Sequence, residues 1–151
     1  MKPRHVFWID LFTALAAGAL LYVGPAPEAE PAELILHGPS YHFDSEAGYN
    51  NQNFGLGYAF DNNVVVGTYE NSLSRTAQNP ERRTSVYAGY LLRLTDHVGI
   101  MAGAVTGYEK MPVQPAALLV LTTPIIGHWR VHFNVAPVKG GVINLSLGYR
   151  S

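Results

Sequence analysis

A histidine and a serine are the residues in this chain whose types suggest catalysis. His37 opens the segment His37–Asp44, and Ser72 follows Glu70 and Asn71 where a strand that starts near Val64 is expected to end. A serine hydroxyl is a weak nucleophile unless a general base lies within hydrogen-bond reach. A barrel could meet this need by bringing two strand ends together at one rim. The alternative is that both side chains lie at loop edges and bond to backbone and water.

Metal and cofactor chemistry have weaker support in the sequence. His128 and His132 fall on the same face of one expected strand, but no cysteine or carboxylate stands beside them. Hydrogen bonding with Arg130 and Asn134 is the favoured interpretation. The chain has no cysteine, which excludes disulfides, thiolate nucleophiles and cysteine zinc sites, and its net charge of −1 gives no field for nucleic acid. We expect no metal and no cofactor.

The composition is unusual for a soluble domain of 151 residues. Charged residues make up 14% of the chain, against about 25% in typical globular proteins. Hydrophobic residues make up 48%, with 15 Gly and 9 Tyr. Such a chain has little material for a hydrated surface, so part of its surface is predicted to face lipid.

The first residues have the layout of an export signal. Lys2 and Arg4 precede the apolar run Val6–Val23, and a Pro-, Ala- and Glu-rich stretch follows it. Cleavage near Gly24 is expected, although an uncleaved anchor would also fit a run of this length. The predicted organisation is a signal or apolar segment at 1–26, a linker at 27–33 and a barrel domain at 34–151.

From Leu34 onward the sequence alternates with a period of two, which is typical of strands with two different faces. In Trp129–Val135 the odd positions are apolar, and in Val142–Arg150 the same pattern repeats. Short turns are predicted at Asp61–Asn63, Thr95–Asp96, Gly127 and Lys139–Gly141, and an exposed loop at Ser74–Arg83. The eight predicted strands are 34–43, 52–60, 64–71, 84–94, 97–107, 114–124, 128–136 and 142–150.

Eight such strands close either as a membrane barrel, apolar outside, or as a soluble lipocalin-like barrel with the faces reversed. The export segment and the low charge favour an eight-stranded antiparallel up-and-down membrane β-barrel. In that case Val131, Phe133, Leu145 and Leu147 should face outward. Because proline cannot donate to a ladder, Pro112 and Pro137 are expected to flank strands, and Pro115 to open a gap between two of them.

Several short motifs resemble the lipid A palmitoyltransferase family of outer-membrane barrels. They are His37 followed by Tyr49-Asn50, Glu70-Asn71-Ser72 followed by Val86–Tyr90, Ala102–Gly107, Met111–Val113 with Leu118–Pro124, and Ala136-Pro137. The resemblance implies a lumen that holds an acyl chain, entry of lipid where prolines interrupt pairing, and transfer from phospholipid to lipid A. By position, His37 and Ser72 match the family's histidine and serine, whereas Asn71 stands where the family has aspartate.

The departure at Asn71 matters because an amide cannot orient a histidine as a carboxylate does. Restoring the carboxylate with Asn71→Asp is therefore expected to raise acyl transfer if the chain is an enzyme. Three hypotheses remain: a lipid A acyltransferase-like enzyme, a non-catalytic outer-membrane barrel, and a soluble periplasmic carrier of an apolar ligand. For the first two we expect a monomer in the bacterial outer membrane with phospholipid and lipid A as partners.

Overall fold

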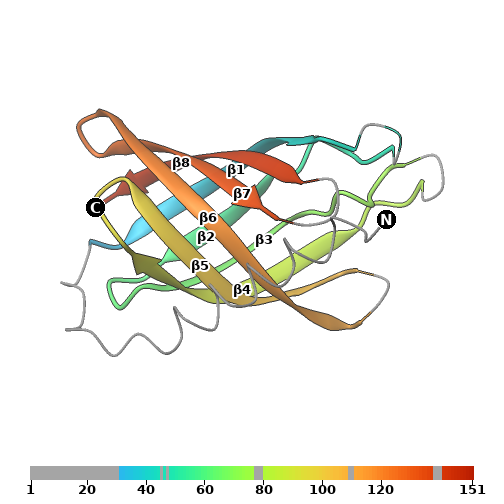
Figure 1. The fold of residues 1–151 in the computed structure, drawn as a ribbon, viewed down its shortest axis with the longest axis horizontal. Coiled ribbons are helices and arrows are strands. Elements are labelled where there is room, and N and C mark those ends of the chain that lie inside the picture. The colour runs from blue at the N-terminus through green and yellow to red at the C-terminus, as the bar shows by residue number, and fades with distance from the viewer. Residues whose placement is uncertain (1–30, 45, 47, 77–79, 109–110, 138–140) are drawn as a thin grey trace, which may run out of the picture.

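The chain forms a closed barrel of eight antiparallel strands (Figure 1). The computed structural model describes residues 31–44, 46, 48–76, 80–108, 111–137 and 141–151. The strands are β1 (Glu33–His42), β2 (Gly55–Ala59), β3 (Val64–Glu70), β4 (Thr84–Arg93), β5 (Val98–Thr106), β6 (Val113–Ile126), β7 (Trp129–Ala136) and β8 (Val142–Arg150). Each strand pairs with the next, and β8 pairs with β1 to close the wall. The predicted up-and-down fold is therefore confirmed.

The barrel begins one residue earlier than predicted, because Glu33 already pairs with Ala59 and Arg150. The signal segment predicted at 1–26 lies outside the described residues, as does most of the linker and of the turn at Lys139–Gly141. No helix in the described part of the chain is long and apolar enough to span a membrane.

Outward-facing apolar side chains line up across neighbouring strands. Phe133 stands opposite Leu121 on β6 and Leu145 on β8, and its side chain is 42% exposed. Val131 and Leu147 pair on the same face. The predicted outward orientation is confirmed, and the lipocalin-like alternative, which needs these side chains inside, is wrong.

The interior is narrow and filled by side chains. Its apolar half consists of Ala59, Val65, Tyr87, Leu91, Met101, Val105 and Val120. The ring of Tyr87 lies over Gly67 and its hydroxyl lies over Gly57, so an added Cβ at either glycine would overlap this side chain. Small residues on β2 and β3 thus make room for one large side chain from β4, as the size of an eight-stranded barrel requires.

The prolines behave only partly as predicted. Pro112 precedes β6 and Pro137 follows β7, as expected. Pro115, however, pairs in register with Ala104 in an unbroken β5–β6 ladder, so there is no gap between β5 and β6 at this position. The β6–β7 ladder begins only at Leu119, so a missing N–H at Pro115 on that side removes no ladder bond. The register instead shifts between His37 and Ser40, and between Pro124 and Ile126.

The two ends of the barrel differ. Three short turns, at residues 60–63, 94–97 and 127–128, join strands at the end where β1 starts and β8 stops. Asn63 has a φ of 64°, which suits the hairpin predicted there. At the other end the connections include residues 43–54 and 71–83. β2 is shorter than predicted because Asn53 is buried outside the ladder, where its side chain donates to the Glu70 carbonyl at 2.7 Å.

Candidate functional site

A buried ionic group lies inside the barrel near the end with short turns. The Glu33 side chain is 2% exposed, and its Oε2 accepts from Arg150 Nε at 3.0 Å. Its Oε1 lies 2.5 Å from His132 Nε2. The other His132 nitrogen lies 2.9 Å from the hydroxyl of Thr122. Gly148 makes this possible, because a Cβ there would overlap Glu33 Oε1.

A second polar group continues toward the other end of the lumen around His37. Its Nδ1 lies 3.1 Å from Ser146 Oγ, and its Nε2 lies 2.7 Å from the Tyr87 hydroxyl. Ser146 is 2% exposed and donates to Asn144 Oδ1, while Asn134 donates to Ser146. The polar residues of β1, β7 and β8 thus bond to one another across the interior, which stabilises a filled lumen.

The structure does not place His37 and Ser72 as the acyltransferase interpretation expects. His37 is on β1, inside the barrel, and Ser72 lies in the turn that follows β3, with β2 between the two strands. The Ser72 backbone carbonyl accepts a hydrogen bond from the Asn50 backbone N–H at 2.8 Å. The serine that His37 contacts is Ser146, which was not among the predicted site residues. Its place at an even position of β8, with Asn144, was the available signal.

Asn71 is completely buried and holds the β3–β4 turn to the end of β5. Its amide nitrogen donates to Ser85 Oγ at 2.8 Å and to the Gly107 carbonyl at 3.0 Å. Its oxygen accepts from the Leu73 amide at 2.7 Å. These three contacts need both ends of an amide, so an asparagine at this position has a structural explanation that does not involve His37.

The favoured interpretation of the two other histidines is partly right. His132 bonds inside the barrel, although its partners are Glu33 and Thr122, and His128 is exposed in the β6–β7 turn. In the described ranges, no three His, Cys, Asp or Glu side chains are grouped so that they could hold a metal ion. A gap beside Leu91, Arg93 and Thr122 is too narrow for a water-sized sphere.

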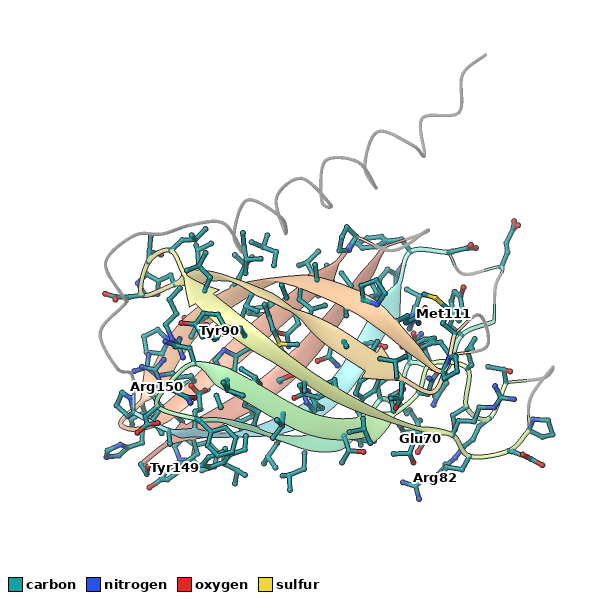
Figure 2. All side chains as sticks on the ribbon, turned by 90° about the horizontal axis from the view of Figure 1, so that it is seen from below. Glu70, Arg82, Tyr90, Met111, Tyr149 and Arg150 are labelled. Atoms are coloured by element: carbon teal, nitrogen blue, oxygen red, sulfur yellow. The ribbon has the colours of Figure 1, made fainter. Side chains whose placement is uncertain are left out.

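The outer surface carries a band of apolar side chains with aromatic residues at both ends. At the end with short turns, Tyr58, Phe60, Tyr90, Trp129 and Tyr149 are exposed, and at the loop end Tyr41, Phe43 and Phe54 are exposed. An apolar hollow of about 240 Å³ is also on this outer face, between Leu34, Leu36, Trp129 and Tyr149. Tyr90 and Tyr149 both lie at the same end of the barrel as Arg150 (Figure 2).

A charged cluster that was not predicted from the sequence lies at the loop end. Glu70, at the end of β3, is buried and contacts two arginines of the following loop, Arg75 and Arg82. The available signal was a carboxylate that ends a strand just before a loop rich in arginine.

No protein-family model and no curated protein matches the chain. Among solved structures, the chain is similar to the outer membrane protein Ail of Yersinia pestis, whose backbone was determined in a phospholipid bilayer nanodisc. The match covers 81% of this chain and all of Ail, with 18% identity and a TM-score of 0.44. It does not single out the lipid A palmitoyltransferase family, and the assignment of an eight-stranded barrel rests on the strand pairing described above.

Proposed function

We propose that this chain is an integral barrel of the bacterial outer membrane whose lumen is a packed core and not a catalytic chamber or a pore. The observation that carries the proposal is the outward apolar band with aromatic side chains at both ends. Membrane barrels have this band, with aromatic residues at the two lipid–water interfaces. Short turns at one end and longer loops at the other are typical of the periplasmic and outer sides. The closed wall leaves no strand edge to pair with another chain, which supports a monomer.

Position 133 gives the proposal a quantitative test. Phe133 is four residues from Trp129 on β7. At about 3.3 Å per residue and a strand tilt of about 40°, Phe133 lies about 10 Å deeper than the aromatic ring. This is close to the middle of an apolar band about 25 Å tall, where a lysine costs about 2–4 kcal/mol. Phe133→Lys should therefore lower the unfolding free energy by that amount in lipid vesicles.

The matched control is a lysine on the same barrel outside the band. Asp61→Lys, in the exposed β2–β3 turn, should leave the unfolding free energy within about 0.5 kcal/mol. The cellular test is fractionation, in which the barrel should enter the outer membrane. A chain recovered from the periplasm, or a Phe133→Lys variant as stable as the parent, would contradict the proposal.

Acyl transfer is a second candidate, because His37 has a serine hydroxyl within hydrogen-bond range inside the barrel. With Ser72 as the matched serine, catalysis requires a rearrangement that brings it to His37. The test is transfer of a labelled acyl chain from phospholipid to lipid A by the parent, His37→Ala, Ser72→Ala and Ser146→Ala. Loss of transfer in His37→Ala and Ser72→Ala with a folded barrel would support the enzyme, and no transfer by the parent would exclude it.

A further inference from the structure

Two exposed arginines are held side by side at the loop end by one buried carboxylate. Arg75 Nε lies 2.9 Å from Glu70 Oε1, and Arg82 Nε lies 3.1 Å from Glu70 Oε2. The Glu70 side chain is 5% exposed, whereas the arginine side chains are 53% and 66% exposed. Glu70 therefore fixes two guanidinium groups at the surface from below.

The way in which the two arginines contact Glu70 leaves N–H donors of each guanidinium for a ligand. Each contact uses Nε, and a guanidinium carries four further N–H groups on its two Nη atoms in a rigid plane. Two positive charges over one carboxylate leave a local charge of +1. Such a pair of planar forks matches the oxygens of a phosphate group, which guanidinium groups bind through paired charge-assisted hydrogen bonds.

The loop is built around this cluster. Ser74 is fully buried, donates to Glu70 Oε1 at 3.0 Å and accepts from the Arg83 amide at 3.0 Å. Arg75 has a φ of 54°, a left-handed conformation that is unfavourable for a non-glycine residue. Its amide donates to the Glu81 carbonyl at 3.1 Å, which helps to hold that conformation. A strained backbone that persists in this way is frequent at ligand-binding positions.

The cluster lies directly outside the apolar band. The Glu70 amide donates to the carbonyl of Phe54 at 2.9 Å, and Phe54 is an exposed aromatic of the loop end. Figure 2 shows Glu70 and Arg82 at the same end of the barrel, opposite the end with Tyr149 and Arg150. In the proposed orientation this is the depth of the headgroups of the outer leaflet.

We propose that Arg75 and Arg82, positioned by Glu70, bind the phosphate of a lipid headgroup in the outer leaflet. The proposal rests on the membrane placement proposed above. A terminal phosphate, with a charge of about −1.5 to −2 and three acceptor oxygens, can engage both forks at once, whereas a carboxylate has two oxygens and one charge. Glu81 is exposed in the same loop, and its charge lowers the local positive potential.

The test uses the full chain folded in phosphatidylcholine nanodiscs with increasing fractions of phosphatidic acid, observed through the arginine Nε–Hε NMR signals. Saturable shifts of Arg75 and Arg82 are expected. Arg75→Gln and Arg82→Gln should each raise the half-saturating fraction about tenfold, the loss of one charge-assisted contact. Arg75→Lys should bind little better than Arg75→Gln, because an ammonium lacks the planar fork of a guanidinium. Glu81→Gln should lower the half-saturating fraction, because it removes a negative charge from the loop. Arg130→Gln removes an equal charge near the other end and should change nothing.

Two further probes separate the explanations. A carboxylated lipid at equal surface charge should give much smaller shifts, and equal shifts would overturn phosphate recognition in favour of general attraction. Inorganic phosphate should act only weakly at the same signals, and a response to it without a response to phosphatidic acid would overturn the lipid source. Signals that do not move in a folded, inserted barrel refute this inference alone, whereas failure to insert refutes the proposed function.

Discussion

Removal of the Glu33 carboxylate should be among the most destabilising single changes in the barrel. One carboxylate oxygen of Glu33 contacts His132 and the other contacts Arg150. All three side chains are at most 10% exposed. Removing one partner of a buried ion pair costs about 3–5 kcal/mol, because it leaves a buried charge without compensation. We expect Glu33→Ala to lose this amount, and Glu33→Gln somewhat less, because the amide keeps one acceptor.

The measurement is urea unfolding in lipid vesicles, followed by circular dichroism, with Asp61→Asn as the control. Asp61 is exposed in a turn, and its variant should stay within about 0.5 kcal/mol of the parent. Replacement of all three partners, as Glu33→Leu with His132→Leu and Arg150→Met, should recover most of the loss because no buried charge remains. A loss under about 1 kcal/mol for Glu33→Ala, or no recovery in the triple variant, would refute this account.

Three other changes test the interior at single contacts by the same unfolding measurement. Gly148→Ala should lower the unfolding free energy by about 1–3 kcal/mol, since its Cβ would overlap Glu33 Oε1. An unchanged unfolding free energy would contradict this packing. Tyr87→Phe should cost about 1 kcal/mol by removing the hydroxyl that contacts His37; an unchanged midpoint would show that this contact contributes nothing. Asn71→Asp should cost about 1–3 kcal/mol, because it loses the donor to the Gly107 carbonyl, and a more stable variant would be evidence against the assigned contacts.

Alternation predicted most of the fold because a closed barrel makes each residue face either lipid or lumen. Phe133 and Leu145 could be assigned to the outside on that basis alone, and their exposure confirms it. Proline effects were harder to predict, since the cost of a missing N–H depends on which side of the strand is paired. Pro115 precedes Leu119, where the β6–β7 ladder starts. Which residues of two strands pair with each other cannot be read from the sequence alone.

The interior contacts could not be predicted because they join residues far apart in the chain. Glu33 and Arg150 are 117 positions apart, and Glu33 and His132 are 99 apart. Their pairing depends on the register of β1 with β8, and that register follows from closure of the whole wall. The predicted linker included Glu33, although a glutamate at the start of a strand, facing a lumen with histidine and arginine, needs a partner.

Asn71 shows how a resemblance in sequence and a contact in the structure lead to different expectations. If the position had lost an acidic partner of His37, a carboxylate there should restore function. In the structure the same change puts a carboxylate beside the Gly107 carbonyl and removes the bond that ties β5 to the β3–β4 turn. The two expectations can be separated, because one concerns acyl transfer and the other concerns stability. Asn71→Asp that unfolds more easily and transfers nothing would assign Asn71 to the architecture of the barrel, whereas transfer by that variant would restore the enzyme hypothesis in spite of the packed lumen.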